Sequence, residues 1–250
     1  MIDIERARRV FSCIDNTSLN ATDNNQSVKA FCRRTMEMRL SDGTTVAAVC
    51  VYPMFVDIAK HTLEGSGIKV ASVAGAFPHG QLPLALKADE VRRVVDDGAD
   101  EVDIVINRGL MLAGEESAVR DEVAAMKESC QGRTLKVILE TGELTPTLIQ
   151  RASEIAIAGG ADFIKTSTGK IATGATLEAA EVMLNVVKEN VKFNKKSIGF
   201  KAAGGIRTPE EALAYAEMAK KILGDNYVNN QTFRIGASRL TESLYSLLTF

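Results

Sequence analysis

The feature of this sequence that most constrains its fold is a regular alternation of short β-rich runs with longer helical patterns. The runs are VAAVCVY, KVASVAGAF, EVDIVIN, TLKVILET, DFIKTST and SIGFKAAGG, beginning at Val46, Lys69, Glu101, Thr134, Asp162 and Ser197. Their starts lie roughly 30 residues apart, which is the length of a strand with its crossover helix. Because crossover connections join parallel strands, this rhythm predicts a parallel sheet covered by helices.

Two further short strands complete a set that can close on itself. We expect them at 14–17 and at FRIGAS, which begins at Phe233. The fold class is therefore α/β, a single (β/α)8 TIM barrel with a short N-terminal helical extension, and 250 residues is a usual size for it. No linker or low-complexity tract divides the chain, so we expect one domain over residues 1–250. An open doubly wound sheet would show the same alternation, but no GxGxxG motif follows any run.

Charge and composition argue against several kinds of partner. The 30 Lys and Arg are balanced by 32 Asp and Glu, which leaves no basic surplus for nucleic acid or an anionic membrane. No apolar stretch reaches the roughly 18 residues that a membrane span needs. The start MIDIERARRV lacks the apolar run of a secretory signal, and the scattered cysteines match neither a zinc nor a disulfide pattern. We expect a cytoplasmic protein with no metal site and with neither nucleic-acid nor membrane partners.

Three charged residues stand inside strands that otherwise look buried on both faces. They are Asp103, Lys165 and Lys201, and an unpaired ion in such a place is expensive. Alternation puts Lys165 on one face with Phe163, and Lys201 on one face with Gly199. All three are expected at or near the carboxyl ends of their strands, where barrel enzymes hold their catalytic groups. We therefore expect them to meet in one cavity.

Two lysines and a carboxylate together suit Schiff-base chemistry. A single strand lysine is explained equally well by a structural ion pair. A second ammonium group nearby lowers the pKa of the first from its reference of about 10.4, so that a neutral amine nucleophile becomes available. A carboxylate beside them can move protons. The pattern by itself does not say which lysine is the nucleophile.

Small-residue turns follow the last strands of the predicted barrel. STGK (167–170), AGGIRT (203–208) and IGAS (235–238) can each bring backbone N–H groups close to an anion, and Lys170 adds a positive charge. Ordinary turn geometry is the commoner reason for any single Gly-Gly pair. STGK is not a nucleotide-binding Walker loop, because Ile164 rather than Gly stands five residues before Gly169. Together the turns predict a phosphate site.

Several segments of the sequence together resemble a known family. The segments EVDIVIN, KVILETGEL, AGGADFIKTSTGK, GFKAAGGIRT and FRIGAS, with IDNTSLN, CVYP and FPHG before them, resemble deoxyribose-phosphate aldolases over nearly the whole chain. These are class I aldolases on a TIM barrel. The resemblance implies reversible cleavage of a small phosphorylated sugar, 2-deoxy-D-ribose 5-phosphate, to D-glyceraldehyde 3-phosphate and acetaldehyde without a metal or organic cofactor. Members are commonly dimers, so a homodimer is expected.

The resemblance also implies roles for individual residues. Lys165 matches the Schiff-base lysine, Lys201 the lysine that perturbs it, and Asp103 the aspartate of the proton relay. The positions that match the family's substrate pocket and phosphate region are Asp15, Thr17, Cys50, Thr168, Gly169, Lys170, Gly204, Gly205, Gly236 and Ser238. Two positions depart from the pattern: Ala202 stands where many members have Pro, and Arg239 where some have a second Ser.

Two other functions use the same residues differently. A metal-free phosphosugar isomerase would employ Asp103 as a base and a lysine as an electrophile, and would form no covalent intermediate. A non-catalytic barrel would bind a sugar phosphate without turnover. Both require the pairing of the two strand lysines to be incidental.

Overall fold

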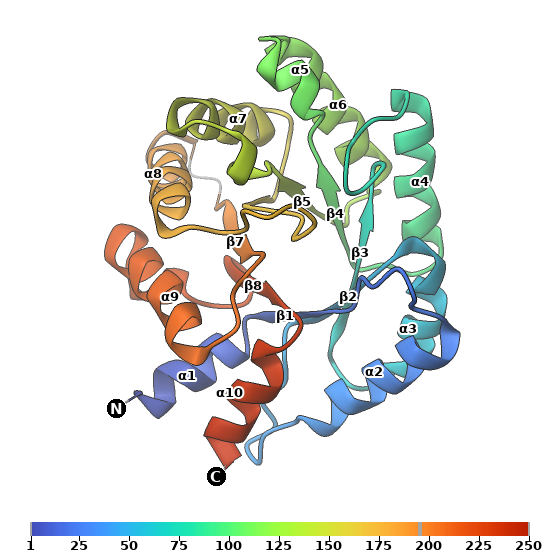
Figure 1. The fold of residues 1–250 in the computed structure, drawn as a ribbon, viewed down its shortest axis with the longest axis vertical. Coiled ribbons are helices and arrows are strands. Elements are labelled where there is room, and N and C mark those ends of the chain that lie inside the picture. The colour runs from blue at the N-terminus through green and yellow to red at the C-terminus, as the bar shows by residue number, and fades with distance from the viewer. Residues whose placement is uncertain (1, 195–196, 250) are drawn as a thin grey trace.

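The computed structural model describes residues 2–194 and 197–249, in which eight parallel strands close into a barrel surrounded by helices (Figure 1). Each strand pairs with the next along the chain, and β8 pairs with β1. The strands are β1 (Ile14–Thr17), β2 (Ala48–Val51), β3 (Lys69–Ala74), β4 (Glu101–Val105), β5 (Thr134–Ile138), β6 (Phe163–Lys165), β7 (Gly199–Ala203) and β8 (Phe233–Ala237). All of them fall within the predicted runs, so the TIM barrel is confirmed.

The helices form the outer layer. They are α1 (Ile4–Phe11), α2 (Asn25–Glu37), α3 (Val56–Thr62), α4 (Leu84–Asp96), α5 (Arg108–Leu112), α6 (Glu116–Ser129), α7 (Pro146–Ala158), α8 (Leu177–Asn194), α9 (Pro209–Leu223) and α10 (Leu240–Thr249), with the short 3₁₀ turns η1 (Pro53–Phe55), η2 (Thr141–Glu143) and η3 (Asp225–Tyr227). Helix α1 precedes the first strand and is the predicted N-terminal extension. It packs against α10, so both ends of the chain lie on one side of the barrel (Figure 1).

Local sequence signals explain where the helices after β6 and β7 begin. The Thr208 hydroxyl caps α9 by accepting from the Glu211 amide, and the Glu211 carboxylate accepts from the Thr208 amide in return. Pro209 occupies the first turn, where its missing N–H costs nothing. Thr176 accepts from the Ala179 amide at 3.1 Å as α8 begins. These caps orient the chain as it leaves the barrel.

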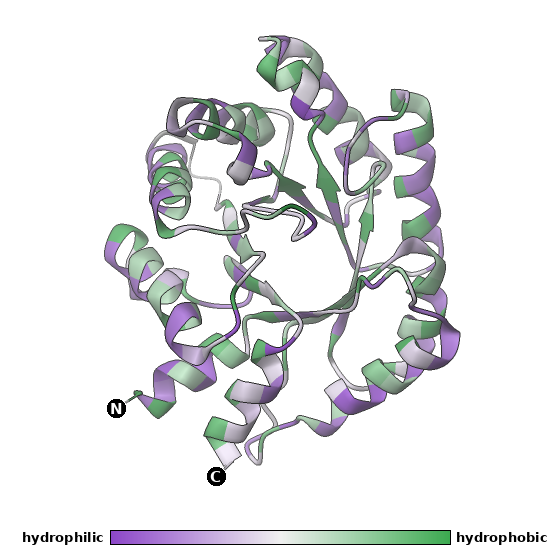
Figure 2. Cartoon of the chain, viewed as in Figure 1, coloured by the Kyte–Doolittle hydropathy of each residue, from purple (hydrophilic) through white to green (hydrophobic). Residues whose placement is uncertain are grey.

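The outward faces of the strands carry the hydrophobic core. Val102 and Ile104 of β4 and Phe200 and Ala202 of β7 belong to one apolar cluster with the inner faces of the helices. Figure 2 shows the same division, with green strands and with helices that are purple on much of their outer side. Because side chains alternate along a strand, the residues between these positions must face the barrel interior.

The barrel interior is partly apolar and partly charged. A small cluster on β2 and β3 contains Ala48, Cys50, Ala71 and Val73. The other strands contribute charged side chains, in a place where branched aliphatic residues are usual. The register brings them side by side, since Asp103 pairs with Lys136, Lys165 with Lys201, and Lys201 with Arg234. The fold thus gathers the strand charges into one group.

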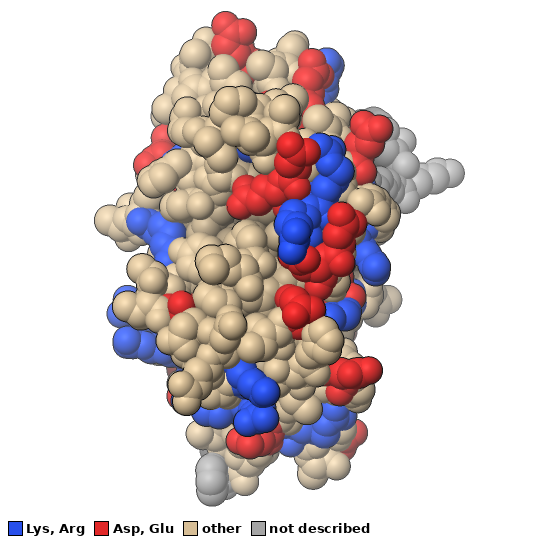
Figure 3. Space-filling model, turned by 90° about the vertical axis from the view of Figure 1, so that its right-hand side faces the viewer, with Lys and Arg blue, Asp and Glu red and all other residues tan. Residues whose placement is uncertain are grey.

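The outer surface has a mixed charge pattern. On the face drawn in Figure 3, basic and acidic side chains lie interspersed around an uncharged area. Among the described residues, no helix is both long and apolar enough to span a bilayer.

Candidate active site

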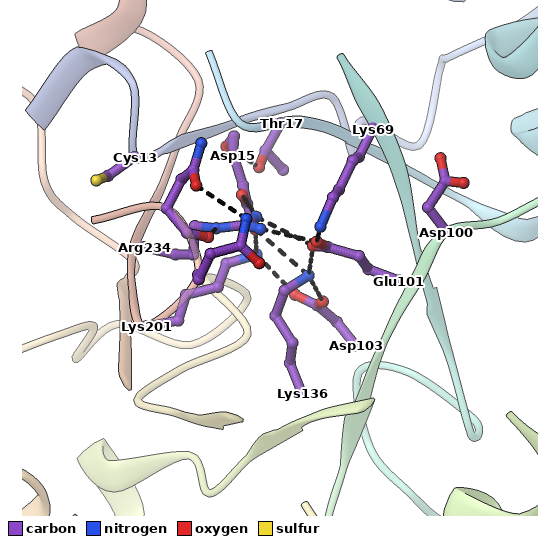
Figure 4. Close-up of polar contacts among 12 residues, drawn as sticks. Cys13, Asp15, Thr17, Lys69, Asp100, Glu101, Asp103, Lys136, Lys201 and Arg234 are labelled. Atoms are coloured by element: carbon purple, nitrogen blue, oxygen red, sulfur yellow. Dashed lines mark hydrogen bonds and ion pairs between the residues drawn. The ribbon is translucent and has the colours of Figure 1, made fainter. Parts of the chain in front are cut away.

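Seven charged side chains from six strands meet inside the barrel, and we call them the interior ion network; Figure 4 labels all of them except Lys165. Its members are Asp15, Glu101, Asp103, Lys136, Lys165, Lys201 and Arg234, each no more than 4% exposed. One carboxylate oxygen, Asp103 Oδ2, accepts from both Lys165 Nζ at 2.8 Å and Lys201 Nζ at 2.7 Å. The predicted meeting of these three residues is confirmed. Lys165 ends its strand, whereas Asp103 and Lys201 lie at the middle of theirs, deeper than expected.

The other four members of the network form ion pairs with Asp103, with Lys201 and with one another. Lys136 Nζ lies 2.8 Å from Asp103 Oδ1 and 2.6 Å from Glu101 Oε2. Arg234 donates to Glu101 at 2.7 Å and to Asp15 at 2.5 Å. Asp15 in turn accepts from Lys201 at 2.5 Å. Every member therefore contacts an opposite charge.

Sequence reasoning missed Lys136, Glu101 and Arg234. They carry the same signal that identified the two catalytic-lysine candidates, a charge inside an otherwise apolar strand, in TLKVI, EVDIV and FRIGA. Glu101 lies two positions before Asp103 on the same strand and therefore on the same face. These three residues could therefore have been predicted from the sequence.

The charges of the network balance without Lys165. Three carboxylates, Asp15, Glu101 and Asp103, face three cations, Lys136, Lys201 and Arg234. A protonated Lys165 would leave one excess positive charge in a buried place, where unbalanced charge is costly. Lys69 also pairs with Glu101, but its side chain is 39% exposed and water screens it. This charge balance favours the neutral amine form of Lys165.

The pKa shifts of the lysines follow this balance. Burial lowers the pKa of Lys165, and the charge of Lys201 lowers it further while Asp103 opposes both. Burial also disfavours charge on Lys201, but Asp103 and Asp15 outweigh it and raise its pKa. The same carboxylate therefore meets two lysines with opposite pKa shifts. The expectation that Lys201 depresses the pKa of Lys165 holds in direction, although burial is the larger cause.

The carboxylates of the network are held in their ionised form. Burial would raise the pKa of Asp103, but Lys136, Lys165 and Lys201 outweigh it and hold that pKa well below its usual value. Lys136 and Arg234 likewise overcome burial and lower the pKa of Glu101 to about 2. Asp103 is consequently a fixed negative charge that can bridge two amines and share a proton between them.

A cavity of about 340 Å³ opens at the carboxyl ends of the strands, beside Lys165. Its lining residues are Thr17, Leu19, Asn20, Lys165, Thr168, Gly169, Lys170, Ala203, Gly204, Gly205, Ile206, Arg207, Gly236, Ala237, Ser238 and Arg239. We call it the glycine-lined cavity. All three predicted small-residue turns reach it, and Lys165 is the member of the ion network that lines it. A molecule in the cavity can therefore meet the amine of Lys165.

The glycine-lined cavity is suited to an anion. Lys165, Lys170, Arg207 and Arg239 line it, and no Asp or Glu is among its described lining residues. The Gly204 and Gly205 backbones adopt φ of +92° and +87°, a conformation that favours glycine and lets the main chain approach a ligand. A phosphate fits this combination. The part of the chain that the structure describes contains no group of three His, Cys, Asp or Glu arranged to hold a metal.

One detail of the predicted phosphate turns is wrong. The Thr168 amide donates to Glu140 at 3.0 Å, and the Lys170 amide donates to the Thr168 hydroxyl at 3.1 Å. These two N–H groups of STGK are occupied within the protein because the loop folds back on Glu140. An anion at this turn would meet the Gly169 amide and the Lys170 side chain instead.

Two of the predicted pocket residues do not reach the cavity surface. Thr17 lines the cavity with the seven predicted residues of the three turns. Asp15 and Cys50 are completely buried and are not among its lining residues. Burial raises the pKa of the Cys50 thiol, and Asp15 belongs to the ion network. Their surroundings are those of supporting residues rather than of groups that touch a ligand.

An amine made nucleophilic by burial, at the mouth of a TIM barrel and beside an anion site, defines the class of Schiff-base aldolases. The model of the DeoC/LacD family aldolases matches residues 9–241 of this chain. The chain belongs to that family.

Solved structures of similar proteins agree with this family. A Toxoplasma gondii ME49 protein assigned as a deoxyribose-phosphate aldolase is 28% identical with a TM-score of 0.87, covering 98% of this chain and 97% of its own. The aldolase QR15 is 32% identical with a TM-score of 0.79, covering 99% and 97%. The tetrameric deoxyribose phosphate aldolase of Aeropyrum pernix is 25% identical with a TM-score of 0.77, covering 98% and 97%.

Proposed function

We propose that this chain is a class I deoxyribose-phosphate aldolase. It cleaves 2-deoxy-D-ribose 5-phosphate reversibly to D-glyceraldehyde 3-phosphate and acetaldehyde through a Schiff base on Lys165. The observation that carries the proposal is the position of Lys165, whose amine lines an anion-binding cavity while sharing one Asp103 oxygen with Lys201. Membership of an aldolase family supports the reaction class. We treat residues 1–250 as one catalytic domain.

The first half of the reaction requires a neutral amine and an electron sink. Lys165 Nζ attacks the substrate aldehyde, and the resulting carbinolamine takes up one proton from solvent and loses water to give an iminium ion. The positive nitrogen then accepts the electron pair released when the bond between C2 and C3 breaks. The Asp103 carboxylate takes up the proton of the C3 hydroxyl, through water where the distance requires it, with the Lys201 ammonium beside it. Glyceraldehyde 3-phosphate leaves, and an enamine remains on Lys165.

The second half releases acetaldehyde. The enamine carbon takes a proton from the same group of residues, and water hydrolyses the resulting iminium, which releases acetaldehyde and one proton to solvent and restores the free amine. The iminium adds one positive charge to the network, and the dianionic phosphate in the adjacent cavity offsets it electrostatically. Binding of the substrate phosphate therefore stabilises the iminium intermediate on Lys165.

The phosphate binds in the glycine-lined cavity. Lys170, Gly169, Gly204, Gly205, Gly236 and Ser238 surround it in this proposal, with Arg207 and Arg239 at the exposed rim. Binding energy from this unreactive end holds the aldehyde at the Lys165 amine. Thr17 contacts the substrate from β1, while Asp15 and Cys50 support the site from within the barrel and do not touch the substrate.

The proposal is tested by trapping the covalent intermediate. The protein is incubated with acetaldehyde or deoxyribose 5-phosphate, with and without borohydride, and analysed by intact mass and then peptide mapping. We expect an ethyl group on Lys165 only when the reductant is present. In Lys165→Leu we expect no adduct and a fall in turnover of roughly 10³-fold or more, with the fold retained because the six remaining network charges still balance.

Other outcomes would change the assignment. The absence of an adduct in folded protein that binds the sugar phosphate would indicate an isomerase or a binding protein. An adduct on Lys201 would exchange the roles of the two lysines.

Two broader expectations accompany the proposal. The four free cysteines are all buried, which suits a cytoplasmic location. We also expect a homodimer, which light scattering on the purified protein can test; the Aeropyrum pernix relative is described as tetrameric.

A further inference from the structure

Glu140 is a buried acid that neither the ion network nor the cavity lining includes. It lies two residues after the end of β5, is completely buried, and has a left-handed backbone with φ of +60°. A residue other than glycine in this conformation is strained and is kept only where its surroundings stabilise it. Something beyond local chain geometry therefore holds Glu140 in place.

Both oxygens of its carboxylate are used to hold one residue of the cavity wall. Oε1 accepts from the Thr168 amide at 3.0 Å, and Oε2 accepts from the Thr168 hydroxyl at 2.5 Å. Because the hydroxyl proton points to Glu140, its oxygen is free to accept from the Lys170 amide at 3.1 Å. The carboxylate thus fixes the loop from Thr168 to Lys170, which lines the cavity.

Neighbouring groups hold this arrangement from both sides. Arg108 Nη1 lies 3.5 Å from the Glu140 carboxylate and 2.9 Å from that of Glu143. Farther along the loop, Gly142 of η2 lies so close to the chain that a Cβ there would be 2.5 Å from the Thr173 carbonyl oxygen. At the other end, the Lys170 ammonium donates to the Leu19 carbonyl oxygen. The Glu140 carboxylate therefore links the loops after β4, β5 and β6, and Lys170 extends this linkage to the loop after β1.

We propose that Glu140 is a positioning residue for the substrate phosphate. Its carboxylate holds Thr168 so that the Gly169 amide and the Lys170 side chain face the glycine-lined cavity. A carboxylate near an anion site would ordinarily repel the ligand, but here both oxygens are bound to donors and a guanidinium lies beside them. This inference rests on the proposed function, because it concerns the phosphate of that substrate.

The test removes one acceptor while preserving shape. In Glu140→Gln, the single amide oxygen can accept from only one of the two Thr168 donors, so the loop loses its fixed position. We expect KM for deoxyribose 5-phosphate to rise about tenfold, the factor that corresponds to about 1.4 kcal/mol, with a much smaller change in kcat. Calorimetry with inorganic phosphate as the probe should show a similar loss of affinity.

Two comparisons separate positioning from a general structural effect. Glu143→Gln is the matched control, because Glu143 shares Arg108 but does not contact Thr168; we expect KM and phosphate affinity to stay within twofold. Acetaldehyde carries no phosphate, so its rate of borohydride trapping on Lys165 should be nearly the same in Glu140→Gln as in the unmodified protein. Parallel losses in trapping rate, kcat and phosphate affinity would overturn the proposal in favour of a general structural role.

A second pair of variants applies if Glu140→Gln does not fold. Thr168→Val removes the hydroxyl at nearly constant volume and should reproduce the rise in KM, whereas Thr168→Ser keeps the hydroxyl and should restore KM. Unchanged KM and phosphate affinity in Thr168→Val would overturn the proposal. The phosphate calorimetry does not depend on turnover, so it tests Glu140 even if the Schiff-base assignment fails.

Discussion

The barrel interior and the cavity beside it differ in whether their charged side chains are paired with opposite charges. In the interior ion network, each carboxylate contacts cations at hydrogen-bonding distance, as Asp103 does with Lys136, Lys165 and Lys201. Along the glycine-lined cavity, Lys170, Arg207 and Arg239 have no carboxylate within ion-pair distance in the described part of the structure.

The two regions differ in this way because water reaches the open cavity but is excluded from the buried network. Buried charges must be neutralised by the protein itself, whereas water can solvate cations at an open cavity, so these cations need no carboxylate partner. Lys165 stands at the boundary, and its environment favours the neutral amine. Three variants, Lys201→Leu, Lys136→Met and Gly205→Ala, separate the roles of the two regions.

Lys201→Leu should have the largest effect of the three. The change removes a cation that contacts both Asp103 and Asp15, so protonation of Lys165 would restore the charge balance and its pKa should rise. We expect kcat/KM at pH 7 to fall by roughly 100-fold or more. The acidic limb of its pH profile should move to higher pH, and raising the pH should restore only part of the activity because Lys201 also takes part in proton transfer. An unchanged pH profile would contradict the electrostatic argument.

Lys136→Met should shift the same pKa without removing a group near the substrate. Loss of this cation leaves the three carboxylates in excess, which raises the pKa of Lys165 and places its protonated, unreactive form at neutral pH. We expect kcat/KM at pH 7 to fall about tenfold for each unit of that shift, and to recover almost fully at high pH.

Lys69→Met is the matched control for this variant, because Lys69 also pairs with Glu101 but is partly exposed. Its pH profile should hardly move. Equal shifts for the Lys136 and Lys69 variants would show that burial is not what gives the network its effect on Lys165. Thermal unfolding of each variant identifies any loss of activity that comes from unfolding.

Gly205→Ala should have the smallest effect on activity and should act only on the cavity. Gly205 and Gly43 both have φ of +87°, and a Cβ at either position would meet nothing within 4 Å. The two alanine variants should therefore lose similar stability, about 1 to 2 kcal/mol. Because Gly205 lines the cavity, only its variant should raise KM, by a few-fold, with kcat unchanged. Equal KM values for the two variants would show that the Gly205 backbone does not approach the phosphate.

The sequence predicted some parts of the site far better than others. Lys165 and Lys201 could be found because a charge in an apolar strand is an unusual and local signal. Thr208 and Glu211 could be found because a capping box is a short pattern. Glu140 gave no such signal: in KVILETGEL it is an ordinary acid after a strand, and its burial arises only when the loop after β6 folds over it.

The strand and helix order, the barrel class and the face on which each strand charge lies can be predicted from the sequence alone, because hydrophobic periodicity is a property of neighbouring residues. Only the tertiary structure decided which charges touch. Alternation assigns Asp103, Lys165 and Lys201 to faces, but the distances between them depend on strand register and barrel closure. The same closure buried Lys136 and Arg234 beside them, and with them the charge balance that favours a neutral amine at Lys165.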